Sequence, residues 1–322
     1  MTMFGYIAKR FAGLFPFVLF VIVLNFTLIQ LAPGDAISFL ISDANVNPEY
    51  LELAKKEYGL DKPIYTQLGI YIWKAFQLDF GYSFFYHRPV FDVIIDRLQA
   101  TLTLTIAAFF ITVLFGLSFG VIASKRPHSI TDSVLSVGGL IVYGMPSFWT
   151  AMVFIIVFGH YLGLFPVYGM VGSRLEGWDY ILDLGHHLVL PALSLGLGRM
   201  ALYMRLTRAS MLEEIRNDYV LTAWSKGSDE NRVFYKHVLR NALVPVVTMM
   251  GIEARLLFSG ALLTETVFAW PGIGRLVYES ILRRDQNIVL SVFVVISVIV
   301  YFANWLADIT YSYLDPRIRK ST

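Results

Sequence analysis

The sequence contains no cysteine in its 322 residues, which excludes disulfide bonds and thiolate metal sites. Charge is scarce as well: charged residues make up 16% of the chain, against about 25% in an average soluble domain. Hydrophobic residues account for 56%, and the mean hydropathy is +0.60. This balance predicts a protein whose solvent is lipid.

Sequence motifs for nucleotide binding and for catalysis are also missing. No G-x-x-x-x-G-K-[ST] pattern occurs, so an ATP-driven process would need an ATPase on another polypeptide. Gly196, Gly198 and Ala201 resemble a dinucleotide fingerprint, but no strand precedes them, and we interpret the glycines as sites of close helix packing. Adjacent His186 and His187 are interpreted as interfacial polar residues. We expect no catalytic residue, no metal, no cofactor bound by this chain and no nucleic-acid partner.

Long apolar runs are what the chain has in abundance. A membrane-spanning helix needs roughly 20 mostly apolar residues. Six runs qualify, at residues 11–31, 101–123, 134–158, 188–206, 242–263 and 288–311. The first run is longer than the apolar core of a secretory signal, and no cleavage-site pattern follows it, so we expect it to be retained. The sequence predicts an all-α membrane protein with six transmembrane helices in one domain, residues 1–322.

The distribution of basic residues predicts the orientation. If the N-terminus is cytoplasmic, six spans place both termini inside, and the inside segments carry fourteen Lys and Arg residues. The short outside segments carry four, namely Arg174, Arg275, Arg283 and Arg284. The long outside stretch at residues 33–99 is discounted, because charge bias is reliable only over short loops. Cytoplasmic loops are enriched in basic residues, so this orientation is the one expected.

Residues 33–99 form the longest segment between two runs, and we expect it to be extracytoplasmic. It holds a helical-looking patch at residues 49–58 and many aromatic side chains. Such aromatic density is typical of a membrane interface and equally of a protein-binding surface. Both interpretations stay open: helices lying on the outer leaflet, or contact with a delivered partner.

A second polar segment separates the fourth and fifth runs. Residues 209–240 are far longer than a chain reversal needs, and helix-forming residues lie on both sides of Gly227. The segment is predicted to be a docking element for a soluble partner. An ordinary amphipathic helix on the inner leaflet is the alternative. Glycine at position 227 permits a sharp reversal that a Cβ atom would hinder.

Three charged residues interrupt the apolar runs: Arg199 in the fourth, and Glu253 and Arg255 in the fifth. A charge at the centre of the bilayer costs roughly 2.5–3.5 kcal/mol on insertion scales, so such residues normally face a cavity or a partner. Glu253 and Arg255 are two apart and do not face each other on a helix. At least one needs a partner elsewhere, as a structural ion pair or as the polar lining of a solute pathway.

Many short motifs along the whole chain resemble those of one family, the permease subunits of ABC importers for dipeptides, oligopeptides and nickel. They occur in the expected order: LAPGD (31–35), GYS (81–83), RPV (88–90), DRLQATLTL (96–104), PSFW (146–149), LVLPALSL (188–195), RLTRASMLE (205–213), LRNALVPVVT (239–248), ETVFAWPGIGRL (265–276) and DPRIR (315–319). The docking loop resembles the family's EAA-type segment, with matches at Thr222, Ala223, Lys226 and Gly227. The chain departs from the family at Arg199, Glu253 and Arg255.

The resemblance implies a complex in the inner (plasma) membrane. A second, homologous permease subunit would complete a heterodimer, two ATPase subunits would bind Mg-ATP, and an extracytoplasmic solute-binding protein would deliver the solute. The loop would hold the ATPase-coupling residues Asp218, Thr222, Ala223, Lys226 and Gly227. A short helix moved by the ATPases would tilt the spans as a rigid body. Arg199, Glu253 and Arg255 are the candidates for the translocation pathway.

The solute is predicted to be a peptide, and an oligosaccharide or nickel is the alternative within the same class. An ion-coupled secondary transporter belongs to a different class, and such folds usually show paired broken helices and inverted repeats. Neither is evident in this sequence. A purely structural membrane scaffold would not need the docking loop.

Overall fold

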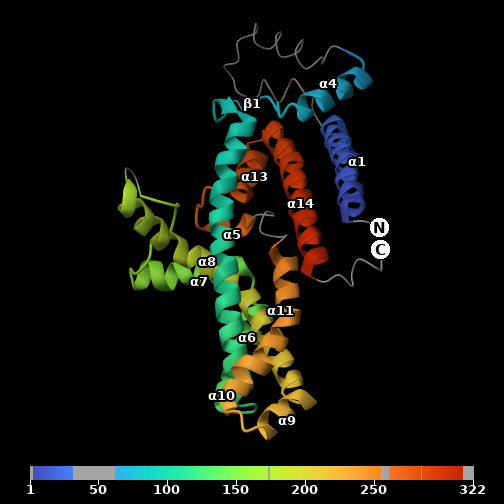
Figure 1. Cartoon of the computed structure of the whole chain (residues 1–322). Helices are drawn as coiled ribbons and strands as arrows, with labels where there is room; N and C mark the ends of the chain where they lie inside the picture. The colour runs from blue at the N-terminus through green and yellow to red at the C-terminus, as the bar shows by residue number, and fades with distance from the viewer. Residues whose placement is uncertain are drawn as a thin grey trace. The chain divides into compact units, whose positions relative to one another are not determined.

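The computed structural model describes residues 3–31, 62–83, 85–172, 175–254, 261–283 and 285–314, and these are mainly helical (Figure 1). The chain divides into two compact units. Unit 1 comprises Met1–Gln99 and Arg275–Thr322, and unit 2 comprises Ala100–Gly274. The expected single membrane domain stays a prediction, because this division does not decide it. The two units are described in turn.

Unit 1 is built on two long helices, α1 (Met3–Leu31) and α14 (Gln286–Leu314), which lie side by side (Figure 1). The side-chain amide of Asn25 donates to the carbonyl of Leu290 at 3.3 Å. The rings of Phe17 and Tyr301 stack with their centroids 5.2 Å apart. Helix α4 (Ile64–Phe76) packs on α1 as well. In its described part, unit 1 is therefore held by apolar packing, and a buried hydrogen bond from the Asn25 side-chain amide joins its two long helices.

A small hairpin, which the sequence analysis did not predict, precedes α5. Its strands are β1 (Tyr82–Ser83) and β2 (Arg88–Pro89), and they pair antiparallel with Tyr82 opposite Pro89. Pro89 lies at the strand's end, where a missing N–H is tolerated. The hydroxyl of Ser83 donates to Asp285 at 3.0 Å, and the hydroxyl of Tyr86 donates to Glu279 at 3.1 Å. Burial raises the pKa of Asp285 above its ordinary value.

Unit 2 holds most of the remaining helices. They are α5 (Val90–Lys125, which begins in unit 1), α6 (Ile130–Gly144), α7 (Ser147–Phe154), the π-helix η1 (Ile155–Tyr161), α8 (Gly177–Glu214), α9 (Asp218–Ser225), α10 (Glu230–Arg232), the π-helix η2 (Val233–Val238), α11 (Leu239–Ala254), α12 (Leu262–Val267) and α13 (Ile273–Leu282, which continues into unit 1). Helix α8 is central, because α6, α7, α11 and α12 all pack on it.

Glycines let α5 approach α8 closely. A Cβ atom added at Gly120 would lie 2.5 Å from the Cβ of Thr207, and one at Gly196 would lie 2.9 Å from the carbonyl oxygen of Ala108. Close packing is therefore confirmed for Gly196. It is wrong for Gly198, where an added Cβ atom meets no described atom within 4 Å.

Within the described residues, three helices are long and apolar enough to cross a membrane: Val90–Lys125, Gly177–Glu214 and Asn287–Trp305. They contain the second, fourth and most of the sixth predicted runs. The first run falls in α1, whose apolar stretch Gly13–Leu28 is shorter. The fifth begins in α11 and continues into residues outside the described part of the chain. The six-span count stays a prediction.

The third predicted run is not one straight helix. Helices α6 and α7 are bent by 104° at the break that contains Pro146. Proline lacks the N–H that would continue the helix, and it pushes the preceding residue out of the helical region. Met145 accordingly has φ −85° and ψ 128°. The run therefore forms either a broken span or a re-entrant loop.

Candidate functional site

The docking loop begins directly after the longest helix of the chain. Helix α8 ends at Glu214, and α9 starts at Asp218 after a turn of three residues. The Glu214 carboxylate accepts hydrogen bonds from the Asn217 amide at 2.8 Å and from the Tyr219 hydroxyl at 2.6 Å. Burial, followed by the bond to Glu214, raises the pKa of Tyr219. One carboxylate thus ties the start of α9 to the end of α8.

The end of α9 is a chain reversal at Gly227. Its φ of +76° lies in the left-handed region, which confirms the expected backbone conformation. The Gly227 N–H donates to the carbonyl of Trp224 at 2.9 Å, and the Ser228 N–H donates to the carbonyl of Ala223 at 3.3 Å. These two bonds form a Schellman motif, in which glycine closes a helix without steric cost.

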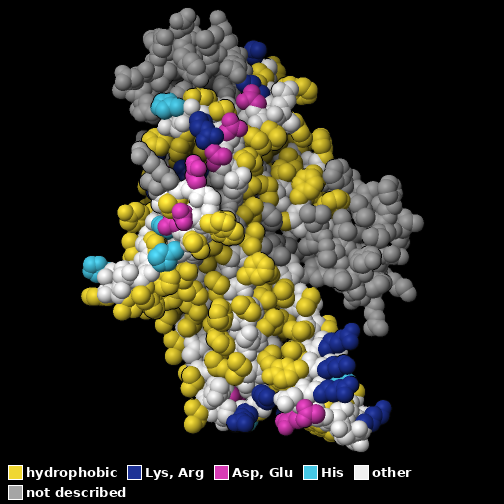
Figure 2. All heavy atoms as spheres, turned by 60° about the vertical axis from the view of Figure 1, so that its left-hand side comes forward, with side chains coloured by type: hydrophobic (Ala, Val, Ile, Leu, Met, Phe, Trp, Pro, Cys, Tyr) yellow, Lys and Arg dark blue, Asp and Glu magenta, His cyan; other side chains and the backbone are white. Residues whose placement is uncertain are grey.

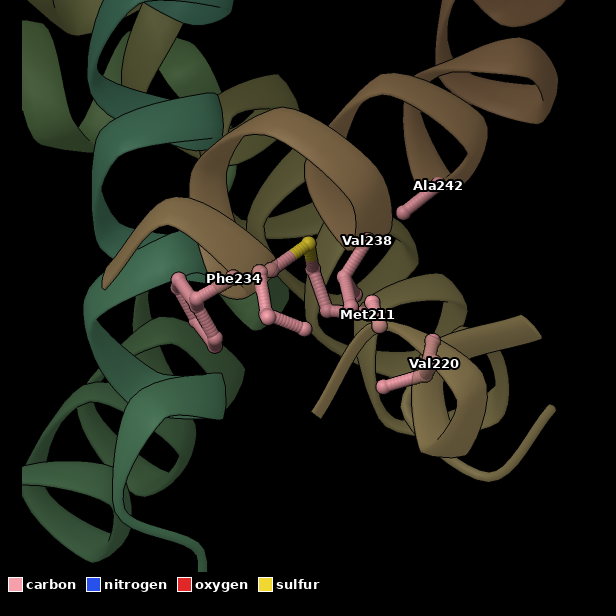
Figure 3. Packing of buried hydrophobic residues seen from close by; sticks show 7 residues of the cluster. Met211, Val220, Phe234, Val238 and Ala242 are labelled. Atoms are coloured by element: carbon pink, nitrogen blue, oxygen red, sulfur yellow. The ribbon is translucent and has the colours of Figure 1, made fainter. Parts of the chain in front are cut away.

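One face of α9 is anchored in an apolar cluster (Figure 3). Val220 and Ala223 of α9 pack with residues from α8, η2 and α11, and the cluster comprises Met211, Val220, Ala223, Val233, Phe234, Val238 and Ala242. Packing against these three elements holds the helix at the end of α8. The inner face of α9 is therefore packed against α8, η2 and α11.

The opposite face of α9 is uncovered. Tyr219, Leu221 and Trp224 are exposed, Leu221 to 54% and Trp224 to 42%. These exposed apolar residues were not predicted from the sequence. Of the five predicted coupling residues, Ala223 is buried, and the other four are exposed: Asp218, Thr222, Lys226 and Gly227. Exposed large apolar side chains on a short charged loop are typical of a protein interface.

Basic side chains gather at the same end of unit 2. Figure 2 shows Lys and Arg at the lower end of the molecule, below a broad apolar surface. The loop and the helices beside it supply Arg216, Lys226, Arg232, Lys236 and Arg240. Lys125 of α5 donates to Asn231 at 3.2 Å and lies 5.7 Å from the ring centre of Tyr235.

The structure brings two of the three charged span residues together. The Arg199 Nη1 donates to the Glu253 Oε2 at 2.8 Å, joining α8 to α11. The Arg199 side chain is 44% exposed and that of Glu253 is 12% exposed. A partner was expected for at least one of Glu253 and Arg255, and Arg199 is the partner of Glu253. Arg255 lies outside the described residues.

A second ion pair on α8 was not foreseen, because Arg208 was counted among the basic residues of the inside loop. The Arg208 Nε donates to Asp132 Oδ1 at 2.6 Å, and its second nitrogen donates to Oδ2 at 2.8 Å. Asp132 also accepts bonds from the His128 N–H and the Ser136 hydroxyl. Its side chain is 5% exposed. The pair fastens the start of α6 to α8.

Among the described residues no group of three or more His, Asp or Glu side chains is arranged to hold a metal ion. A His186 ring nitrogen lies 2.8 Å from the carbonyl oxygen of Leu164. His187 lies 3.3 Å from the Asp183 carboxylate, one helical turn earlier. This carboxylate was not predicted from the sequence.

Two family models together match most of the chain. Residues 113–320 match the inner-membrane component of binding-protein-dependent transport systems, and residues 3–105 match the N-terminal part of such membrane components.

Curated relatives match over the whole length. The di/tripeptide transport system permease DppB of Pseudomonas aeruginosa is 37% identical over 98% of this chain and 99% of its own. The oligopeptide transport system permease AppB of Bacillus subtilis is 36% identical, and the dipeptide transport system permease DppB of Escherichia coli K12 is 34% identical, each over 98% of this chain and 99% of its own. Among solved structures, a chain of the inward-facing MetNI methionine ABC transporter matches with a TM-score of 0.52. It is 18% identical over 67% of this chain and 93% of its own, so it supports the fold alone.

Proposed function

This chain belongs to the family of inner-membrane components of binding-protein-dependent transport systems, and on that premise we propose that it forms half of the translocation pathway of an ABC importer for peptides. A second, homologous permease subunit supplies the other half. Two ATPase subunits bind and hydrolyse Mg-ATP, and an extracytoplasmic solute-binding protein delivers the peptide. The chain itself catalyses no reaction, and both of its termini lie on the cytoplasmic side of the inner membrane.

The loop helix α9 carries this proposal. Its outer face offers Leu221 and Trp224 to a partner, while Val220 and Ala223 lock its inner face to α8. A helix held in this way can seat in a cleft of an ATPase and move as one body with the span above it. Asp218, Thr222, Lys226 and Gly227 then lie at or beside the docking surface, and Ala223 acts through its packing.

The peptide solute is supported by the whole-length relatives, which are named for dipeptides, tripeptides and oligopeptides. An oligosaccharide or nickel is distinguished by measuring what the cognate binding protein binds. The aromatic segment at residues 33–99 is the proposed contact for that protein. Its described part exposes Tyr65 and Trp73 on α4, and Tyr82 and Phe85 at the hairpin.

Coupling is tested at the reversal point of the loop. Gly227→Val should abolish most peptide uptake in the reconstituted transporter, because a β-branched residue resists the φ of +76°. Gly227→Asn is the matched control, since asparagine tolerates the left-handed region, and it should transport close to wild type. Trp224→Ala should lower co-purification of the ATPase, while the exposed Ser225→Ala should not. Normal uptake by Gly227→Val would contradict the coupling role.

Energy source and orientation are tested separately. Ion-driven accumulation of solute by the isolated chain would contradict the ABC proposal in favour of a secondary transporter. Because the chain contains no cysteine, Tyr65→Cys and Ser225→Cys are clean topological probes. An impermeant thiol reagent added outside should label the first and not the second. The reverse pattern would overturn the proposed orientation.

A further inference from the structure

The ion pair between Arg199 and Glu253 involves the middle of α8, one of the described helices that are long and apolar enough to cross a membrane. Arg199 is 22 residues after the helix start at Gly177 and 15 before its end at Glu214. At 1.5 Å per residue, this places it about 33 Å and about 22 Å from the two ends. A charge at this depth faces water or protein rather than lipid. Its position therefore indicates a polar surface inside the assembled transporter.

The pair leaves much of its bonding capacity unused within the described part of the chain. A guanidinium has five N–H donors and a carboxylate has about four acceptor positions. One hydrogen bond, at 2.8 Å, joins the two groups. The Arg199 side chain as a whole remains 44% exposed. A ligand can therefore reach Arg199 while the ion pair is intact.

There is room for a ligand beside the pair. Gly198 precedes Arg199 on α8, and a Cβ atom added there would meet no described atom within 4 Å. Gly116, Gly120 and Gly196 lie in close contact between α5 and α8, whereas Gly138, Gly144 and Gly185 are open in the same way as Gly198. The open glycine and the exposed guanidinium occupy neighbouring positions.

From this placement we infer that Arg199 and Glu253 form a binding site for the two charged ends of a short peptide, with Arg199 receiving its carboxylate and Glu253 receiving its ammonium group. The inference rests on the proposed peptide function. A peptide with free termini carries both charges at neutral pH, because the α-carboxyl and α-amino pKa values are roughly 3.5 and 7.8. The peptide opens the ion pair by exchange, and every charge keeps an opposite charge beside it.

The exchange selects for length. An extended chain spans at most about 3.3–3.6 Å per residue, so the ends of a dipeptide are separated by about 7 Å. Modest separation of two flexible side chains accommodates such a ligand. A longer peptide can bind only one of the two residues with one of its charged ends. The charge of the other residue is then left without an opposite charge beside it. The site therefore favours peptides of two or three residues over longer ones.

The test removes both charges together, so that neither is left unpaired. The complete transporter, with its partner permease, ATPases and binding protein, is reconstituted in proteoliposomes, and uptake of a labelled dipeptide is measured per ATP hydrolysed. Arg199→Met/Glu253→Gln should reduce this ratio about tenfold and should weaken the preference for a dipeptide over a pentapeptide. The matched control is Arg275→Met/Glu279→Gln, which removes an ion pair within one helix and should stay within twofold of wild type.

A second variant leaves the charges in place. Gly198→Leu fills the space beside Arg199 and should also reduce dipeptide uptake per ATP several-fold, even if the neutral double variant fails to assemble. Uptake within twofold of wild type in either assembled variant would overturn the site. If the wild-type transporter takes up no peptide at all and its binding protein delivers another solute, the proposed function fails and the inference fails with it. Normal wild-type peptide uptake with unaffected variants refutes the inference alone.

Discussion

Two ion pairs connect α8 to its neighbours, and they use the same kinds of charged group in opposite settings. At Asp132 and Arg208 two parallel hydrogen bonds join a carboxylate that is 5% exposed to a fork of guanidinium nitrogens. At Arg199 and Glu253 a single bond joins a half-exposed guanidinium to a carboxylate. Bidentate pairs add geometric specificity as well as energy. The first pair therefore holds helices together, and the second remains open to exchange.

The largest expected effect follows from breaking the closed pair. Arg208→Met leaves the Asp132 carboxylate buried without its cation, and breaking a buried pair costs about 3–5 kcal/mol. The free energy of unfolding, measured by detergent-induced unfolding of the purified transporter, should fall by that amount. Arg199→Met is the matched variant and should cost less than Arg208→Met, because it loses one hydrogen bond in place of two and the Arg199 side chain is 44% exposed. An equal decrease in the free energy of unfolding for the two variants would contradict the difference between the two ion pairs.

Double-mutant cycles sharpen the comparison, because they isolate the energy of each pair. The variants Asp132→Asn and Arg208→Met, alone and combined, should give a coupling energy of about 2–3 kcal/mol. The same cycle on Arg199→Met and Glu253→Gln should give less than about 1 kcal/mol. A larger coupling energy at the second pair than at the first would show that it is structural.

Glycines near the two ion pairs allow the packing around each pair to be tested without changing any charge. A methyl group at Gly120 would lie 2.5 Å from the Cβ of Thr207, next to Arg208 in α8. Gly120→Ala should therefore destabilise the transporter by about 1–3 kcal/mol through overpacking. Gly198→Ala, where the space is open, should stabilise it by up to about 1 kcal/mol, because alanine favours a helix. The same unfolding measurement checks both signs.

The smallest effect concerns a supporting bond of the closed pair. The Ser136 hydroxyl donates to Asp132 Oδ1 at 3.2 Å. Ser136→Ala should cost about 0.5–1.5 kcal/mol, the net value of one hydrogen bond. Ser225→Ala loses a hydroxyl bonded only to its own helix and should change the free energy of unfolding less. If the order is reversed, Ser136 does not hold the carboxylate in place.

Local signals in the sequence predicted the features that depend on few residues. The apolar runs around residues 101–123 and 188–206 lie inside α5 and α8. Gly227 has the left-handed φ that a reversal needs. The break at Pro146 also had a local signal, because a proline interrupts the third run, and hydropathy alone concealed it. The sequence signal for the hairpin before α5 was weaker, because each of its strands has only two residues.

Contacts between residues far apart in the chain could not be predicted from local sequence signals. Arg199 and Glu253 are 54 positions apart, and Asp132 and Arg208 are 76 positions apart. The sequence indicated that at least one of Glu253 and Arg255 needs a partner, because an unpaired charge in lipid is costly. It did not show which cation, since the packing of α8 on α11 and on α6 decides that. The exposed face of α9 was missed for the same reason: only packing tells which side of a short helix is covered.

Unit 2 is closed by hydrogen bonds between its own two ends, and this has a consequence for biogenesis. The Thr101 hydroxyl donates to the fully buried Glu265 carboxylate and accepts the Ile273 N–H, both at 2.8 Å. The Trp270 indole donates to the carbonyl of Ala100 at 2.8 Å. These bonds join positions 164 to 172 residues apart. These bonds to Thr101 and Ala100 therefore form late in synthesis, after residues 265, 270 and 273 have been translated. A nascent chain that stops before residue 265 cannot form any of them, so unit 2 cannot close until nearly all of it has been made.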